Sequence, residues 1–178
     1  SCPTRETYHD DGAFSTEEVD LDAIDATHWS TDESGTAGTI TVEDHEPASG
    51  GRGLRISTSG QTSGDEALAR FTDVSISSGE LRRYLQLVLN IPTLESGAVV
   101  EVRVEDSTGS QAAAVIDATA DATADATIAT ATGSGIVYQT QLGDLATSMD
   151  GIEAIEVSVA GANATVEFAG LNAERESA

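Results

Sequence analysis

Apolar and polar residues alternate along most of this chain, which is the pattern of half-buried β-strands. The alternation is plainest at 84–91 and 98–105, where each segment has one apolar face and one largely polar face. Glycine, aspartate, serine and asparagine separate such segments. The pattern predicts about eight to ten strands. Nine can be assigned, at Thr39–Glu43, Leu54–Thr58, Ala67–Phe71, Tyr84–Ile91, Ala98–Glu105, Gln111–Ile116, Ile136–Leu142, Ile152–Ala160 and Ala164–Asn172.

Short strands at this spacing predict an all-β fold, an antiparallel jelly-roll β-sandwich. Asp106 and Gly109 occupy the first and fourth positions of a predicted type I turn between two strands. Residues 161–163 separate the last two strands. A short turn at 144–149 is the one helix that we expect, and it is too short for the crossover helices of an α/β fold.

We expect two parts in the chain, an N-terminal arm at 1–28 and the β-sandwich domain at 29–178. The one internal repeat is the run of Asp, Ala and Thr at 117–127. A helix there would place Asp over Asp at i, i+4, which is repulsive, so we predict an extended arm or hairpin. Such a strand lies either against a neighbouring subunit or in solvent as a loop.

The chain is strongly acidic, with 31 Asp and Glu against 8 basic residues, all of them Arg, and a net charge of −23 over 178 residues. This charge argues against nucleic acids and membrane surfaces as partners. Many acids, no Lys and few bulky apolar side chains resemble the proteins of salt-in halophiles, chiefly haloarchaea. The alternative is an ordinary acidic domain.

The halophile interpretation predicts that the fold weakens as salt is lowered. About 1 M salt shortens the Debye length to roughly 3 Å and so screens the repulsion between carboxylates. Thermal melts in a series of salt concentrations should therefore show a melting temperature that rises with salt. A protein equally stable in dilute buffer would contradict this interpretation.

Motifs for catalysis are missing from the sequence. The histidines His9, His28 and His45 lie in no recognisable setting, and there is no G-x-S-x-G segment for a nucleophilic serine. Pairs of carboxylates carry no information, because 31 acids produce such pairs by chance. The sequence predicts a protein that is not an enzyme, and its single cysteine excludes an internal disulfide.

Loops rich in carboxylates suit a structural cation, since Ca²⁺, Mg²⁺ and Na⁺ bind oxygen ligands. Asp20, Asp22 and Asp25 have a spacing that can converge at a loop, so they are the candidate metal ligands. Asn163 begins an Asn-Ala-Thr sequence at a predicted exposed turn and is the candidate for N-glycosylation.

A sugar-binding patch is the other candidate site. If the strands at 84–91, 99–105 and 136–142 share a sheet, their polar faces gather an aromatic ring with amide and charged neighbours. An ordinary solvated sheet face or a subunit interface are the alternatives. The candidate carbohydrate-binding residues are Tyr84, Gln86, Asn90, Glu101, Arg103, Gln139 and Gln141.

The order of strands from Trp29 to Asn172 resembles the galactose-binding-like and carbohydrate-binding-module jelly rolls. The resemblance rests on Gly53–Ile56, Leu81–Ile91, Val99–Asp106 with its Ser-Thr-Gly turn, Tyr138–Leu145, Ile155–Val159 and Thr165–Ala173. It implies a sandwich of eight or more strands that binds sugars, bridges subunits or holds a structural Ca²⁺.

A second resemblance is compositional. A small Lys-free jelly roll, with neither the basic and apolar regions of a signal peptide nor an enzyme motif, looks like a virion component of a haloarchaeal tailed virus. This implies a capsid-decoration or tail and host-contact protein, made in the host cytoplasm and exposed to high salt. Its expected partners are other virion subunits, further copies of itself and a host-surface glycan. The alternative is a carbohydrate-binding module of a haloarchaeal surface protein or glycosidase.

Overall fold

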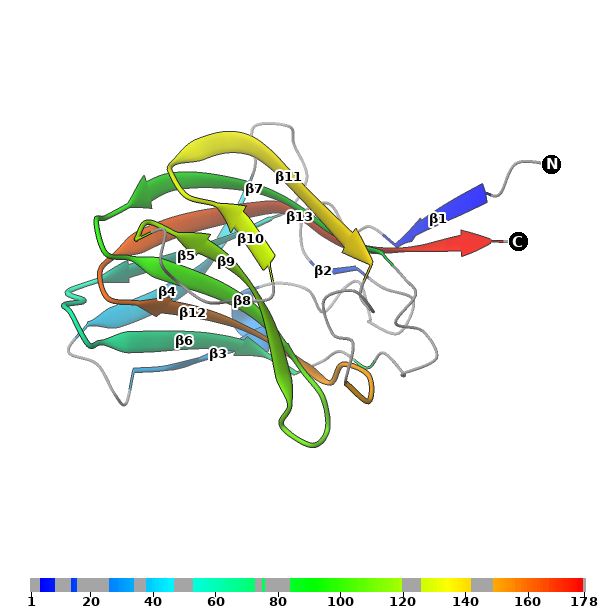
Figure 1. Ribbon diagram of the computed structural model, residues 1–178, viewed down its shortest axis with the longest axis horizontal. Helices are drawn as coiled ribbons and strands as arrows, with labels where there is room; N and C mark the ends of the chain where they lie inside the picture. The colour runs from blue at the N-terminus through cyan, green and yellow to red at the C-terminus, as the bar shows by residue number, and fades with distance from the viewer. Residues whose placement is uncertain are drawn as a thin grey trace.

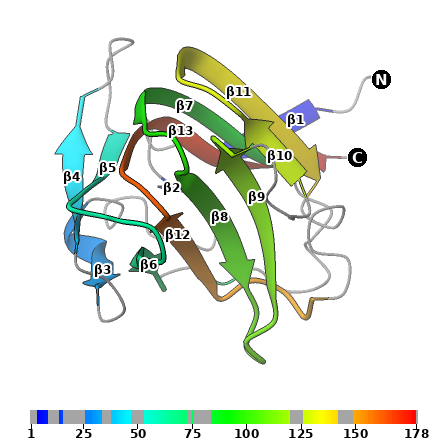
Figure 2. The ribbon, with the colours of Figure 1, turned by 60° about the vertical axis from the view of Figure 1, so that its left-hand side comes forward.

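Two β-sheets packed face to face make up the described part of the protein (Figures 1 and 2). The computed structural model describes residues 4–8, 14–15, 26–33, 38–46, 53–72, 75, 84–119, 126–141 and 149–177. The predicted β-sandwich is confirmed, and each of the nine predicted strands forms. The predicted helical turn at 144–149 lies outside the described residues except for Met149.

The larger sheet has seven strands, five of them in the order β11-β7-β13-β5-β4, with β1 and β2 paired to β13. The other sheet has six strands in the order β10-β9-β8-β12-β6-β3. All pairs are antiparallel except β10 with β9 and β2 with β13. The elements are β1 (Thr4–Tyr8), β2 (Phe14–Ser15), the 3-10 turn η2 (Ala26–His28), β3 (Trp29–Asp32), β4 (Thr39–His45), β5 (Gly53–Ser59), β6 (Glu66–Phe71), β7 (Tyr84–Leu94), β8 (Val99–Glu105), β9 (Gln111–Asp117), β10 (Ala126–Ala129), β11 (Gly133–Gln141), β12 (Ala154–Ala160) and β13 (Ala164–Ser177).

The core lies between the sheets and is built from the apolar face of each strand. On β8 the valines Val100, Val102 and Val104 are buried, whereas the residues between them are only partly buried. Leu89 and Ile91 of β7 enter the same core from the other sheet. Burial of these β-branched and aliphatic side chains is the main force that holds the sheets together.

Aromatic side chains support the edge strand β3. Trp29 at its start packs on Phe71 of β6 with the ring centroids 5.5 Å apart, and Phe71 is fully buried. Next to this edge, the Ile40 backbone N–H donates to Glu33 at 3.3 Å, which ties the segment after β3 to β4 of the other sheet. The short strand β3 is thereby fixed by core packing as well as by its pairing with β6.

Loops at one end of the sandwich are joined by polar contacts. The Asn163 side chain accepts from the Gln61 N–H at 3.0 Å, and the Asn163 N–H donates to the Glu95 carboxylate at 2.8 Å. Gly161 donates its N–H to the Asp65 carbonyl at 3.0 Å. The predicted break between the last two strands is therefore a crossover between sheets that is tied to two other loops.

Gly161 is expected to tolerate a side chain poorly. It has a φ of +82°, and a Cβ there would lie 2.5 Å from the Gly97 carbonyl oxygen. Gly64 has a similar φ of +92°, but a Cβ there would meet nothing within 4 Å, so it is the matched control. Gly64→Ala should cost about 1 kcal/mol from left-handed strain alone and Gly161→Ala about 2 kcal/mol, measured by urea unfolding. Equal losses would contradict the steric argument.

The predicted N-terminal arm contributes strands to the seven-stranded sheet. β1 pairs antiparallel with the far end of β13, from Thr4 with Ser177 to Tyr8 with Ala173, and β2 pairs with residues 171–172 of the same strand. Figure 1 shows β1 beside the C-terminal end of β13, so the two ends of the chain lie together. No helix in the described part of the chain is long and apolar enough to cross a membrane.

The low-complexity run, predicted to be extended, is described only in part. Asp117 ends β9, and its carboxylate accepts the Thr119 N–H at 2.7 Å. Residues 120–125 lie outside the described residues, and Ala126–Ala129 form β10, which runs parallel to β9. The end of the repeat is thus a strand of the six-stranded sheet.

Candidate binding face on the six-stranded sheet

The seven predicted sugar-binding residues do not share one sheet. β7 and β11, which carry Tyr84, Gln86, Asn90, Gln139 and Gln141, belong to the seven-stranded sheet, whereas β8, which carries Glu101 and Arg103, belongs to the six-stranded sheet. The assumption that the three strands are neighbours is therefore wrong, because β8 pairs with β9 and β12. The residues of the predicted patch are therefore divided between the two sheets.

On the seven-stranded sheet the predicted residues are brought together by the strand register. Gln86 pairs with Gln139, and Tyr84 pairs with Gln141. Residues that pair across antiparallel strands share a face, so these four positions lie on one face of the sheet. Asn90 is partly buried on the same strand, and its side-chain oxygen accepts the Gly135 N–H at 2.8 Å, which fixes the irregular start of β11.

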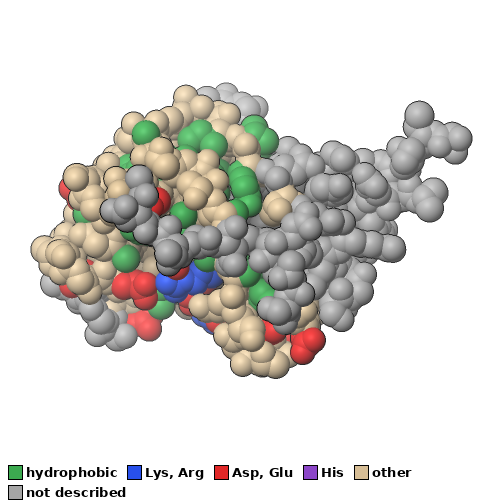
Figure 3. Space-filling view, in the orientation of Figure 1, with side chains coloured by type: hydrophobic (Ala, Val, Ile, Leu, Met, Phe, Trp, Pro, Cys, Tyr) green, Lys and Arg blue, Asp and Glu red, His purple; other side chains and the backbone are tan. Residues whose placement is uncertain are grey.

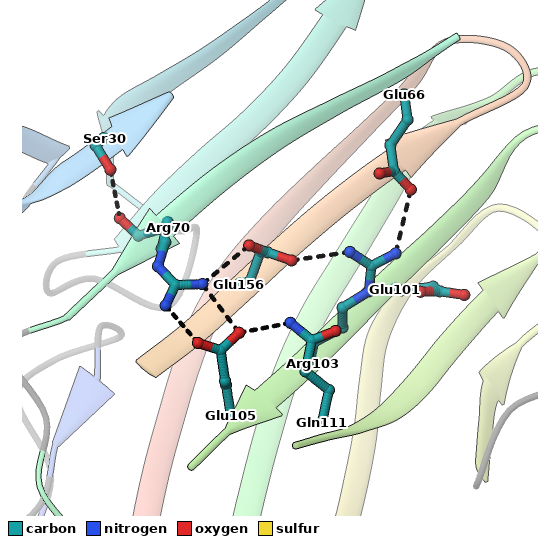
Figure 4. Close-up of polar contacts among 8 residues, drawn as sticks. All are labelled: Ser30, Glu66, Arg70, Glu101, Arg103, Glu105, Gln111 and Glu156. Atoms are coloured by element: carbon teal, nitrogen blue, oxygen red, sulfur yellow. Dashed lines mark hydrogen bonds and ion pairs between the residues drawn. The ribbon is translucent and has the colours of Figure 1, made fainter. Parts of the chain in front are cut away.

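On the six-stranded sheet, charged side chains form a network across the face turned away from the core (Figure 4). The register places Arg70 of β6, Glu156 of β12 and Arg103 of β8 in one row. Glu156 stands between the two arginines, with one oxygen 3.2 Å from Arg70 Nη1 and the other 2.8 Å from Arg103 Nη1. We call Glu66, Arg70, Glu101, Arg103, Glu105 and Glu156 the charged network.

Each arginine has further carboxylate partners. Arg70 Nη2 donates to Glu105 at 2.6 Å, and Gln111 donates to the other Glu105 oxygen, also at 2.6 Å. Arg103 donates from Nε to Glu101 at 2.7 Å and from Nη2 to Glu66 at 3.1 Å. Four carboxylates therefore surround two guanidiniums, and the network keeps a net negative charge.

Burial differs along the network. The Glu156 side chain is 7% exposed and that of Arg103 17%, whereas that of Arg70 is 33% exposed. Burial lowers the pKa of Arg103, but hydrogen bonds to Glu156 and Glu101 outweigh it and raise that pKa above its usual value. The hydrogen bond from Arg70 is the main cause of a lowered pKa at Glu105. The shifts at Arg103 and Glu105 therefore favour the charged form of both residues.

A groove of about 350 Å³ lies beside the network at the β3 edge of this sheet. It is lined by Ser30, Thr31 and Asp32 of β3, Leu68 and Arg70 of β6, and Glu156 of β12. The hydroxyl of Ser30 also lies 3.5 Å from the Arg70 carbonyl oxygen. In the view of Figure 3, arginine side chains reach the surface together, with acidic side chains next to them. The groove offers hydroxyls, charged groups and one aliphatic side chain.

The β8–β9 turn holds one end of this face in place. The side chain of Asp106 accepts the Thr108 hydroxyl at 2.7 Å, the Thr108 N–H at 2.9 Å and the Ser110 N–H at 3.0 Å through one oxygen. Its other oxygen accepts the Asp150 N–H at 3.1 Å. The predicted turn is confirmed, with Gly109 donating to the Asp106 carbonyl at 3.1 Å. The Asp106 side chain also joins this turn to the segment before β12.

These hydrogen bonds, led by that of the Thr108 hydroxyl, lower the pKa of Asp106 from 3.8 to about 2. A carboxylate with a depressed pKa in the folded state adds stability above its unfolded pKa, and this stability is lost as the pH falls toward the folded value. Asp106→Asn replaces one of the two accepting oxygens by an N–H₂ group, which cannot accept a hydrogen bond. Either the Asp150 N–H or the donors of Thr108 and Ser110 then lose their acceptor, so the variant should be less stable at pH 7. The deficit relative to wild type should shrink between pH 3.8 and 2, measured by chemical unfolding across pH. A deficit independent of pH would contradict this role.

The remaining candidates fall elsewhere. Asp20, Asp22 and Asp25 lie outside the described residues, so their role as cation ligands stays a prediction. Within the described ranges, no three His, Cys, Asp or Glu side chains form a metal-binding group. Asn163 lies at the predicted turn, partly buried, with its side-chain oxygen bound to Gln61. Its glycosylation also stays a prediction.

Sequence reasoning found only two members of the charged network, Glu101 and Arg103. The others were missed, although the two-residue period of β6 and β12 already places Arg70 and Glu156 opposite to the core face. The two-residue period was therefore the sequence signal that could have placed these two residues on the outer face. The partners of each side chain needed the strand order, since Glu156 is 86 residues from Arg70 and 53 from Arg103.

Solved structures with a similar arrangement of strands include carbohydrate-binding modules. The family 11 carbohydrate-binding module from Clostridium thermocellum, in complex with a β-1,3-1,4-mixed-linked tetrasaccharide, matches with a TM-score of 0.52 and 11% identity, over 98% of this chain and 96% of that one. A carbohydrate-binding module of the β-sandwich superfamily matches with a TM-score of 0.52 and 10% identity, over 91% of this chain and 62% of that one. The chain has the β-sandwich fold of these modules.

More distant likenesses add nothing to this fold assignment. The tailspike protein 4 enzymatically active domain of bacteriophage CBA120 matches with a TM-score of 0.48 and 16% identity, over 83% of this chain but only 19% of that one. That likeness is too weak to support an inference. No protein-family model matches the chain, and no curated protein sequence matches it.

Proposed function

We propose that this protein is a non-catalytic carbohydrate-binding module that binds a neutral glycan on the outer face of the six-stranded sheet. The observation that carries the proposal is the groove beside the charged network, where Arg70 and Glu156 are already held by ion pairs. The fold shared with two carbohydrate-binding modules supports it. Binding to groups that are fixed in advance loses little side-chain entropy.

The groups that line the groove fit the chemistry of a sugar. Sugar hydroxyls donate to carboxylates such as Asp32 and accept from a guanidinium such as Arg70, and they exchange both roles with the hydroxyls of Ser30 and Thr31. Leu68 gives an apolar surface for the C–H groups of a sugar ring. The volume of about 350 Å³ suits a short saccharide or a few residues of a longer chain.

Electrostatics favour a neutral glycan over an anionic one. Four glutamates outnumber the two arginines of the network, and Asp32 adds a further acid at the groove. A sulfated or uronic-acid polysaccharide would meet this negative field and would also be repelled by the chain as a whole, which carries −23. Neutral hexose and pentose polymers carry no such penalty.

The lowered pKa of Glu105 supports binding rather than glycoside hydrolysis. A glycosidase needs one carboxylic acid that is protonated near neutral pH, which requires a raised pKa. Here the pKa of Glu105 is lowered, and Glu156 is bound by two guanidiniums. Glu105 is therefore poorly suited to give a proton to a leaving group.

The test is a glycan array with neutral and acidic saccharides in about 0.1 M and 1 M salt, followed by calorimetric titration of the best neutral ligand. Asp32→Ala and Leu68→Ala should each weaken binding about tenfold, by roughly 1.4 kcal/mol. Thr41→Ala, an exposed residue on β4 of the other sheet, should leave binding unchanged. Loss of binding in Tyr84→Ala with no effect of the groove variants would place the site on the seven-stranded sheet instead. Absence of any glycan ligand would refute the function.

The virion role, the halophilic origin and a host-surface glycan as partner rest on composition alone and stay predictions. The likenesses to solved structures support glycan binding, the alternative function, over a structural role in a virus particle. Co-purification of the protein with virus particles would restore the virion role, and it would not exclude glycan binding.

A further inference from the structure

The outer edge of β11 is unusual for this chain because it carries no charge. β11 is the last strand at one edge of the seven-stranded sheet, and within the described residues no strand pairs with its outer side. Its nine residues, Gly133–Gln141, include no Asp, Glu or Arg, although charged residues make up 22% of the chain. They also include no proline.

Exposed strand edges normally carry charges, prolines or irregularities that prevent pairing with another chain. At the opposite edge of the same sheet, β4 carries Glu43 and Asp44, and the edge strand β3 of the other sheet carries Asp32. β10 is uncharged but has only four residues. β11 has one irregularity, between Gly133 and Ile136, and its remaining residues pair regularly with β7.

Side-chain exposure marks the same strand. Val137 is 59% exposed, and it is the large apolar side chain that stands out as exposed in the described part of the molecule. Ile136 and Tyr138 are partly buried and pack against the core, so Val137 lies on the opposite, outer face. Figure 2 draws β11 at the outer margin of the sandwich. The strand therefore presents an uncharged edge and an exposed apolar side chain at the margin of the sheet.

The charge distribution determines which partner suits this edge. Two copies of a chain with a net charge of −23 repel each other over most of their surfaces. A contact along β11 avoids direct contact between acids, because neither copy contributes one. We infer that β11 pairs antiparallel with β11 of a second copy, so that the two seven-stranded sheets become one continuous sheet across a two-fold axis.

The two-fold axis restricts the register of this pairing. If the two-fold axis is normal to the sheet, the core-facing surfaces of both copies lie on the same side of the joined sheet. Two residues that pair across the interface must then both face the core or both face outward. The axis must then lie midway between the two copies of one residue, which pairs with itself, and Tyr138 is near the centre of the regular segment 136–141. In this register Val137 of the two copies are diagonal neighbours, about 7–8 Å apart.

This dimer is expected to be weak and to strengthen with salt. One edge pairing buries less than the roughly 1,200 Å² of a standard interface, so dissociation in the micromolar range or above is expected. Salt screens the repulsion between two acidic copies, so added salt should favour the dimer. An interface built on ion pairs would show the opposite dependence.

Sedimentation equilibrium of the full chain tests the inference, from about 5 to 500 µM protein in about 0.1 M and 1 M salt. We expect a monomer–dimer equilibrium whose dissociation constant falls in high salt. Val137→Glu should raise that constant at least about tenfold, and so should Val137→Lys. An equimolar mixture of the two variants should restore dimers, because the new charges attract. Thr41→Glu, with the same added charge on the exposed outer face at the opposite edge, should behave as wild type.

Three results would overturn the inference. A wild-type protein that stays monomeric at every concentration and salt would exclude the dimer. A Val137→Glu protein that dimerises as wild type would place any interface away from β11. Equal weakening by Thr41→Glu would show that added charge, wherever it lies, is the cause. Circular dichroism melts serve as the control for folding. Because Val137 and Thr41 are exposed, each variant should fold as wild type does.

Discussion

Phe71→Ala should lower the free energy of unfolding by about 4 kcal/mol, since it removes a fully buried aromatic ring and leaves a cavity. For a chain of this size, that corresponds to a melting temperature lower by roughly 8–16 °C. Phe71 also packs on Trp29, at the start of β3. Three residues of β3 line the groove, so saccharide binding should weaken as well.

The measurement is urea unfolding, where the midpoint should fall while the slope stays constant. Phe71→Leu is the control, because it keeps most of the volume and should cost about 1 kcal/mol. If Phe71→Ala came within about 1 kcal/mol of wild type, the packing of β3 on the core would be far weaker than the structure indicates.

Arg103→Met should cost about 3 kcal/mol, because it leaves the buried carboxylate of Glu156 with a single cationic partner. Glu101 and Glu66 lose their bonds to the same guanidinium. Arg70→Met is the comparison. Arg70 is 33% exposed, and without it Glu105 keeps its bond to Gln111 and Glu156 keeps its bond to Arg103. Arg70→Met should therefore lower the free energy of unfolding by only about 1 kcal/mol.

The double variant Arg103→Met with Glu156→Met separates the cost of a lost bond from the cost of a stranded charge. A buried ion pair replaced by apolar side chains is often nearly neutral, so the double variant should be more stable than Arg103→Met alone. The free energy of unfolding is measured with urea at constant salt for the wild type, Arg103→Met, Glu156→Met and the double variant. A double variant that loses as much as the two single variants together would show that Arg103 and Glu156 contribute independently, and would contradict the cost of a stranded charge.

Much of the fold was predictable because strand character is local. The two-residue period of β8 sorts buried residues from partly exposed ones within one strand, whatever lies next to it. The turn at Asp106 was predictable for the same reason, since its side chain bonds to backbone groups two and four residues ahead. The parallel pairing of β10 with β9 had no such local signal.

The candidate site was predictable only in part. Glu101 and Arg103 were found because both lie on the polar side of one strand, but they were grouped with Tyr84 of a strand in the other sheet. A sandwich has two outward-facing surfaces, and the strands of both sheets show the same alternation of apolar and polar residues. Nothing in the spacing of polar residues says to which of the two a strand belongs.

By itself, the sequence determined which segments are strands, which side of each strand faces the core, and that the surface is acidic, because these follow from backbone geometry and composition. Only the tertiary structure decided which strands are neighbours. It placed Glu156 between Arg70 and Arg103, put β3 beside them to complete a groove, and left the uncharged β11 at an edge. Pairing depends on burial and hydrogen bonds between residues far apart in the chain, and these are satisfied only when the whole sandwich is assembled.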